Sequence, residues 1–120
     1  MDKNKFKYSD CAMHRSMGVL GTKWKPIVIW ILRDRKKARF GQIAATIGLI
    51  SRKVLTTTLK ELENDGLILR EEHKELPPRV EYSLTKKGKA LLPIMRQLVD
   101  WDIQFHEAVI HANQPAGIQG

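Results

Sequence analysis

The sequence of 120 residues predicts a single, mainly α-helical domain with one small β-hairpin. Apolar residues recur every three or four positions over several segments, which is typical of amphipathic helices. Strict alternation at Val80, Tyr82 and Leu84 is typical of a strand. The length suffices for one core and is too short for two, and the 42% apolar and 28% charged content is that of an ordinary globular chain.

Two helices are expected in the N-terminal third of the chain. Ser9 or Asp10 can cap the first, which ends at Gly21. The second spans about residues 24–33, with Pro26 in its first turn, where backbone N–H groups lack partners in any case. The spacing of its apolar residues predicts a largely buried helix; these residues are Trp24, Ile27, Val28, Ile31 and Leu32.

A short helix, a tight turn and a longer helix follow. Gly48 opens the turn, Ser51 is a natural N-cap for the longer helix, and Gly66 ends it after Asp65. Leucines at helical spacing predict the buried face of the longer helix. The short helix is marked by Phe40, Ile43, Ala44 and Ile47, and the inner face of the longer one by Leu55, Leu59 and Leu62, with Val54 and Thr58 on the flank.

The outer face of the helix from Ser51 to Asp65 is polar, and its leading half is cationic. The helix begins with cations and ends with anions, which is the reverse of what its macrodipole favours. We therefore expect the cations to serve an external anion. Lys53, Thr56, Thr57 and Lys60 lie opposite the leucines, with Arg52 between the two faces, and the trailing acids are Glu61, Glu63 and Asp65.

A β-hairpin and a long helix complete the chain. Residues 67–73 and 79–84 read as strands, joined by a stiff tip that contains Pro77 and Pro78. Thr85 can cap a last helix of about 22 residues. Its apolar stripe is wider than one small domain needs, which predicts a dimer seam formed by Leu91, Ile94, Leu98, Trp101 and Phe105. We expect a domain over residues 1–112 and a flexible tail over residues 113–120.

The charge of the chain favours a polyanionic partner. The formal net charge is +8 and the pI is about 9.8. Residues 97–120 hold three acids and no Lys or Arg, so the first 96 residues carry +11. A solvated basic surface without a partner is the alternative.

A helix–turn–helix followed by a hairpin is typical of winged helix–turn–helix proteins that read duplex DNA. We predict that the Ser51–Lys60 segment enters a major groove, and that Arg79, assisted by Lys74, contacts DNA from the hairpin, which is the wing. For each residue a solvated surface is the alternative, and Arg79 can instead form a salt bridge with Glu81 or Glu75. The expected major-groove residues are Ser51, Arg52, Lys53, Thr56, Thr57 and Lys60.

Order and motifs together resemble the HxlR-type transcriptional regulators, a winged helix–turn–helix branch of the MarR-like group, over about residues 9–106. The resemblance rests on Cys11, on Gly21-Thr22-Lys23-Trp24, on Arg39-Phe40, on the segments 50–55 and 59–68, and on Pro77-Pro78-Arg79 running on to Gly88. It implies a dimeric DNA-binding regulator whose outer helices pair and whose hairpin lies beside the DNA. Where the family pattern places a polar cap at the start of the third helix, this chain has Gly41.

Cys11 is the only cysteine, which excludes an internal disulfide and suits a reducing cytosol. It lies near the start of the first helix with cations close in sequence, and both features stabilise a thiolate. The resemblance implies that such a cysteine senses oxidants, quinones or aldehydes. Disulfide formation between protomers, a mixed disulfide and S-alkylation all remain open, and an inert packed thiol is the alternative.

Other classes of function find little support in the sequence. No serine elbow, phosphate-binding loop or second pair of metal ligands is present, so we expect no enzyme, no cofactor and no metal. The longest apolar run, residues 26–32, is far short of the roughly 20 residues of a membrane span, and we expect a cytoplasmic protein. Two rivals remain: a winged helix used for protein contact, and a sensor of a small aromatic ligand held among Trp24, Trp30 and Trp101 at a dimer interface.

Overall fold

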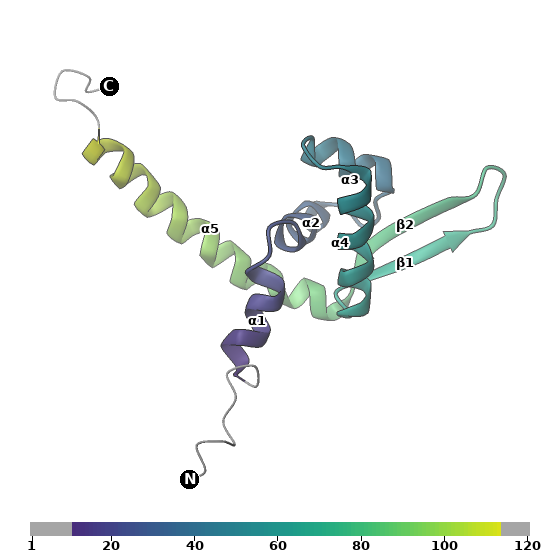
Figure 1. The fold of residues 1–120 in the computed structure, drawn as a ribbon, viewed down its shortest axis with the longest axis horizontal. Coiled ribbons are helices and arrows are strands. Elements are labelled where there is room, and N and C mark those ends of the chain that lie inside the picture. Colours follow the sequence, from purple (N-terminus) through teal and green to yellow (C-terminus); the bar gives the residue numbers. More distant parts are fainter. Residues whose placement is uncertain (1–10, 114–120) are drawn as a thin grey trace, which may run out of the picture.

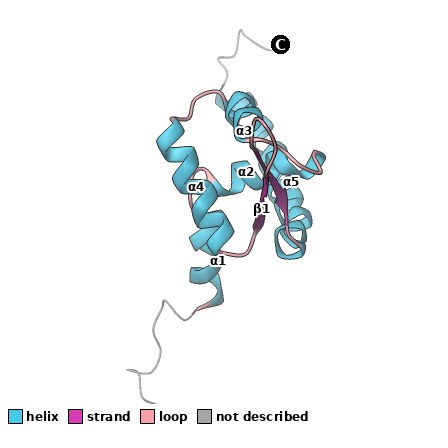
Figure 2. Ribbon diagram, turned by 90° about the vertical axis from the view of Figure 1, so that its right-hand side faces the viewer, coloured by secondary structure: helices cyan, strands magenta, loops and turns pink. Residues whose placement is uncertain are grey.

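The computed structural model describes residues 11–113, with side chains for residues 11–106. It confirms a mainly helical fold with one antiparallel hairpin (Figures 1 and 2). In chain order the elements are α1 (Ala12–Leu20), α2 (Lys25–Ile31), the 3₁₀ turn η3 (Leu32–Asp34), α3 (Phe40–Ile47), α4 (Arg52–Asn64), β1 (Ile68–His73), β2 (Arg79–Leu84) and α5 (Lys86–Asn113).

The core lies where α2, α3, α4 and the base of the hairpin meet. Helix α2 is contacted by α1, α3, α4 and α5, so one helical face does not describe its burial. Ile29, outside the predicted stripe, is fully buried, whereas Ile27, inside that stripe, is exposed. Helix α2 also ends at Ile31 and continues as η3. Among the described residues, the largest fully buried side chains are Val28, Ile29, Leu32, Ile43, Leu55, Leu59, Leu62 and Leu67.

The predicted turns and their glycines are confirmed. Gly48 (φ 84°) ends α3 and Gly66 (φ 75°) follows α4, and both lie in a region that side chains with a Cβ rarely adopt. Gly41 is inside the first turn of α3 and is not its cap. The cap is Arg39, whose backbone N–H donates to Gln42 Oε1 at 2.9 Å.

The hairpin pairs β1 with β2 from Ile68↔Leu84 to His73↔Arg79. The connector before α3 also joins this sheet, because Ala38 N donates to Tyr82 O at 2.9 Å and Tyr82 N donates to Ala38 O at 2.8 Å. Residues 35–39, which form this connector, had no predicted place in the sheet. The hairpin is therefore anchored on one side by the connector and projects from the helical body beside α4 (Figure 1).

Two predicted helix boundaries differ in the structure. Cys11 is the N-cap of α1, and the predicted caps Ser9 and Asp10 lie outside the described residues. Thr85 caps α5 as predicted, since Gly88 N donates to Thr85 Oγ1 at 3.1 Å. Helix α5 is 28 residues long and reaches Asn113, so it is longer than the predicted 22 residues. Residues 114–120 lie outside the described part.

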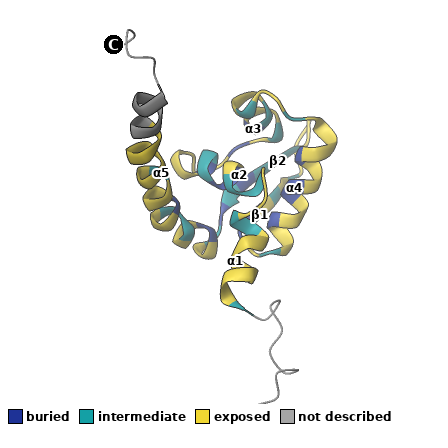
Figure 3. Ribbon diagram, turned by 60° about the vertical axis from the view of Figure 1, so that its left-hand side comes forward, coloured by how far each residue is buried: buried dark blue, intermediate teal, exposed yellow. Residues whose placement is uncertain are grey.

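No helix within residues 11–113 combines the length and the apolarity needed to span a membrane. Helix α5 instead leaves the core and extends away from the hairpin (Figure 1). Most described residues of α5 are exposed, whereas α4 has buried residues on the side that faces the body (Figure 3).

Candidate nucleic-acid interface

Helix α4 is fixed to the core along one face and capped at its start. Leu55 and Leu62 are fully buried and Leu59 is 2% exposed. Thr58, expected on the flank, is also buried, and its hydroxyl donates to Val54 O at 2.8 Å. At the N-terminus, Ser51 Oγ accepts from Val54 N at 3.1 Å, as the capping prediction requires.

The outward face of α4 carries the predicted reading residues. Lys53, Thr57 and Lys60 are exposed. Thr56 is exposed too, but its hydroxyl donates to Arg52 O at 2.8 Å, so only its lone pairs and methyl group face outward. The Arg52 guanidinium lies over the Phe40 ring, 4.7 Å from its centroid, which holds it between the faces as predicted.

The trailing end of α4 is stabilised by cations from other elements. Lys25 Nζ lies 3.0 Å from Asp65 Oδ2 and 3.9 Å from Glu61 Oε1, and it also donates to Gly18 O. Lys87 Nζ donates to Asp65 O at 2.8 Å. These contacts supply the positive charge that the C-terminus of a helix favours. The cations at the start of α4, Arg52 and Lys53, are exposed.

The hairpin places its two predicted DNA contacts differently. Lys74 is exposed at the tip. Arg79 forms the ion pairs that the sequence left open as its alternative: its Nη1 lies 2.7 Å from Glu75 Oε2 and its Nε 3.6 Å from Glu81 Oε2. Arg79 therefore shares its charge with two carboxylates, and Lys74 is the less constrained cation of this pair.

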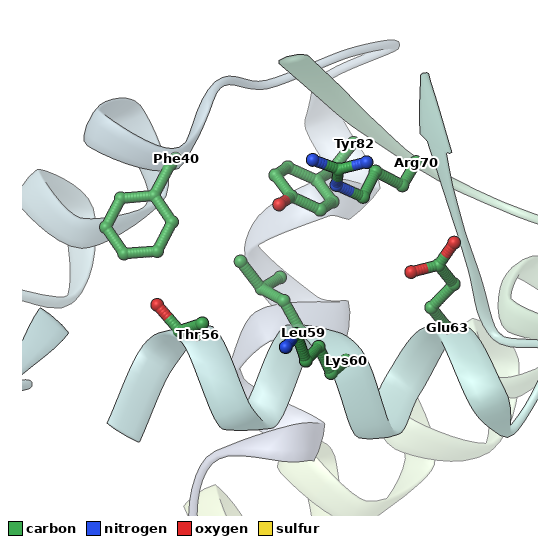
Figure 4. Close-up of a pocket in the computed structure, with 7 residues that line it drawn as sticks. All are labelled: Phe40, Thr56, Leu59, Lys60, Glu63, Arg70 and Tyr82. Atoms are coloured by element: carbon green, nitrogen blue, oxygen red, sulfur yellow. The ribbon is translucent and has the colours of Figure 1, made fainter. Parts of the chain in front are cut away.

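A cavity of about 350 Å³ opens between α4 and the hairpin (Figure 4). Helix α4 contributes Thr56, Leu59, Lys60 and Glu63; β1 and β2 contribute Arg70 and Tyr82; α3 contributes Phe40. The sequence analysis missed Arg70. Its alternation with Leu69 on β1 is the only signal that could have placed it on this side of the hairpin, because its approach to α4 depends on tertiary packing.

Cys11, as the N-cap of α1, is half-buried. Its side chain makes no capping hydrogen bond. The backbone N–H groups of His14 and then Met13 favour the thiolate and lower the pKa of Cys11; burial opposes this in part, and Arg15 adds a smaller lowering. The predicted position at the helix start is confirmed, and the cysteine has the electrostatic setting that increases thiol reactivity.

The predicted dimer seam is mostly exposed in the single chain. Ile94, Leu98, Trp101 and Phe105 are 51–60% exposed, and Leu91 is half-buried. Between α1 and α5 lies an apolar cavity of about 640 Å³, lined partly by Met13, Met17, Leu20, Leu67, Leu91 and Ile94.

The three tryptophans each have a different neighbour in the described part of the chain. Lys23 lies over Trp24, Arg33 lies over Trp30, and Trp101 packs against Phe105 at 6.2 Å between ring centroids. No tryptophan lines the two cavities described above.

Comparison with known proteins shows the family. The HxlR-like helix-turn-helix family matches residues 19–109. An uncharacterized HTH-type transcriptional regulator of Halalkalibacterium halodurans is 43% identical over 89 residues, covering 74% of this chain and 79% of that protein. The matches are transcriptional regulators, which agrees with the prediction that the chain is not an enzyme.

Solved structures agree with this family. Reduced YodB of Bacillus subtilis superposes with a TM-score of 0.71 at 38% identity, covering 79% of this chain and 93% of YodB. The redox regulator HypR in its oxidized form gives 0.73 at 38% identity, covering 78% and 96%. YodB also matches in a diamide-treated and in a quinone-bound form. The chain thus belongs to the HxlR-like helix-turn-helix family of transcriptional regulators.

Proposed function

We propose that this regulator binds duplex DNA sequence-specifically by placing α4 in a major groove. The observation that carries the proposal is the division of α4 into two faces. Its leucines are buried, while Lys53, Thr57 and Lys60 point away from the core. Lysine and arginine can donate to guanine O6 and N7, and threonine offers a hydroxyl or a methyl group. Arg52 and Lys53 are proposed to read bases and Lys60 to bind phosphate.

We also propose that the protein acts as a homodimer on a palindromic site, with α5 as the main contact. The exposed leucine and aromatic side chains of α5 support this, because water-exposed apolar area of that extent favours burial against another surface. Two-fold symmetry would present two α4 helices to successive major grooves, about 34–36 Å apart.

Fluorescence anisotropy with labelled duplexes from the region upstream of the gene tests this proposal. We expect saturable binding to a palindrome that weakens steeply with salt, because neutralised phosphates release counterions. Lys60→Ala should weaken binding to all duplexes alike, whereas Arg52→Ala and Lys53→Ala should reduce the preference for the palindrome. Unchanged binding by all three variants would exclude this placement of α4.

A second proposal is that oxidation or electrophile modification of Cys11 switches DNA binding. It is supported by the lowered pKa of the thiol and by the similarity to two solved proteins. HypR is a redox regulator, and YodB has a solved quinone-bound form. Cys11→Ser should bind DNA like the parent and lose any response to diamide, a quinone or an aldehyde. A Cys11→Ser variant that responds like the parent would make the thiol a bystander.

A further inference from the structure

The cavity between α4 and the hairpin has no role in the interface as proposed so far. It opens along the side of α4 that carries Thr56 and Lys60, facing Arg70 on β1 (Figure 4). We infer that this cavity seats one sugar–phosphate strand of the DNA, with Lys60 on one side and Arg70 on the other binding its phosphates. This inference rests on the proposed function, since it requires α4 to lie in the major groove.

The geometry of duplex DNA leads to this inference. Adjacent major and minor grooves are separated by a single backbone strand, and a helix fits the wider major groove. With α4 in the major groove and the hairpin extending over the neighbouring minor groove, that strand must pass between the two elements. The cavity is the hollow between them, and its lining comes from both.

Arg70 is built into the sheet in a way that suits a phosphate contact. It pairs with Tyr82 across the strands, and Figure 4 shows its guanidinium beside the Tyr82 ring. Hydrogen bonds to Glu72 and then to Tyr82 raise the pKa of Arg70. A guanidinium has five N–H donors, and Arg70 Nη1 donates to Glu72. This contact is an ion pair, so a phosphate shares the guanidinium with Glu72, and it can bind the donors that Glu72 leaves free.

The acids near the cavity define where the strand can lie. Glu63 lines the end of the cavity farther along α4, one turn beyond Lys60 (Figure 4). Its carboxylate repels a phosphate placed at that end, so the phosphates are confined to the part nearer Thr56, Lys60 and Arg70. The DNA strand accordingly crosses the leading half of α4, the half that also carries Arg52 and Lys53.

The inference can be tested without a known operator, because phosphate contacts are independent of sequence. The full chain is titrated against a labelled 30-base-pair duplex of mixed sequence over a series of NaCl concentrations. We expect Arg70→Gln to bind about tenfold more weakly, from the loss of a charged hydrogen bond. We also expect the slope of log K against log salt to be smaller by about 0.9 for each lost phosphate contact. Arg70→Lys should restore most of the slope.

Two further variants separate this effect from a general loss of charge or fold. Arg35→Gln removes an exposed arginine that lines a different cavity beside Lys89 and Leu92, and it should leave the slope unchanged. Glu63→Gln should tighten binding by roughly threefold, since it removes a repulsive charge near the strand. Glu63 is exposed, so this variant does not disturb the core.

The outcomes distinguish this inference from the proposal beneath it. Either of two results overturns the strand placement alone. One is that Arg70→Gln binds like the parent with an unchanged slope; the other is that Glu63→Gln binds more weakly than the parent. Absence of duplex binding by the parent at low salt overturns the proposed DNA-binding mode and this inference together.

Discussion

Helices α4 and α5 each present an outward face, and the two faces differ in kind. The outward face of α4 is polar and cationic, whereas that of α5 carries Leu98, Trp101 and Phe105, each at least half exposed. Charged and hydroxyl groups are well solvated in water. Large apolar side chains each gain about 1.5–3 kcal/mol when they are buried. The outward face of α4 is thus well solvated in a single chain, whereas the outward face of α5 would gain free energy if a second surface covered it.

The most disruptive change we predict falls on α5. Leu98→Glu places a charge in the middle of the proposed seam and should convert the proposed dimer into a folded monomer. Loss of the second α4 should lower affinity for a palindromic duplex by about 10²- to 10⁴-fold, since linked binding sites gain that much from avidity. Sedimentation and anisotropy measure the two effects.

A matched leucine elsewhere shows whether this effect is specific to α5. Leu69 is 50% exposed on β1, close to the 52% of Leu98. Leu69→Glu should leave the oligomeric state, measured by sedimentation, unchanged. A dimeric Leu98→Glu variant with parental DNA affinity would show that α5 is not the seam.

The second prediction concerns the buried side of α4. Leu55 is fully buried, and Leu55→Ala should lower the free energy of unfolding by about 2–5 kcal/mol, because it removes buried methyl groups and leaves a cavity. Urea denaturation measures this loss. The neighbouring Val54 is 40% exposed, and Val54→Ala should have a much smaller effect. Equal losses at both positions would contradict the assignment of the inner face.

The sequence predicted the elements well where a local pattern determined them. The leucine face of α4, the Ser51 and Thr85 caps and the two glycine turns all depend on neighbours within a few residues. The burial of Ile29 and the bridge of Ala38 to Tyr82 depend on packing from several directions, which no single periodicity records.

The candidate site shows the same limit. The cationic face of α4 was visible in the sequence, but the compensation at its other end was not, because Lys25 and Lys87 reach Asp65 from 40 and 22 residues away. For Arg79 the sequence left a DNA contact and an ion pair both open, and the structure shows the ion pairs with Glu75 and Glu81. The sequence did not point to Arg70, because only the tertiary fold brings it to the cavity beside α4.

The third prediction concerns the start of α4. Ser51→Ala removes the acceptor for Val54 N and should lower the free energy of unfolding by about 1 kcal/mol. DNA affinity should also fall, since the cap orients the turn that carries Arg52 and Lys53. Thermal denaturation measures the stability change. Ser16 bonds Ala12 O within α1 and is exposed, so Ser16→Ala is the control and should change stability less.

The smallest expected effect lies at the other end of the molecule, in the ionisation of Cys11. The N–H groups of His14 and Met13 lower the pKa of its thiol, so the thiolate fraction at neutral pH exceeds that of a free cysteine. The rate of alkylation by iodoacetamide, followed by mass spectrometry, should therefore rise with pH to a midpoint below the free value of about 8.5. In urea the midpoint should return to that value. Because Cys11 is the only cysteine, Cys11→Ser must show no alkylation, and the same midpoint with and without urea would show that the helix start does not activate the thiol.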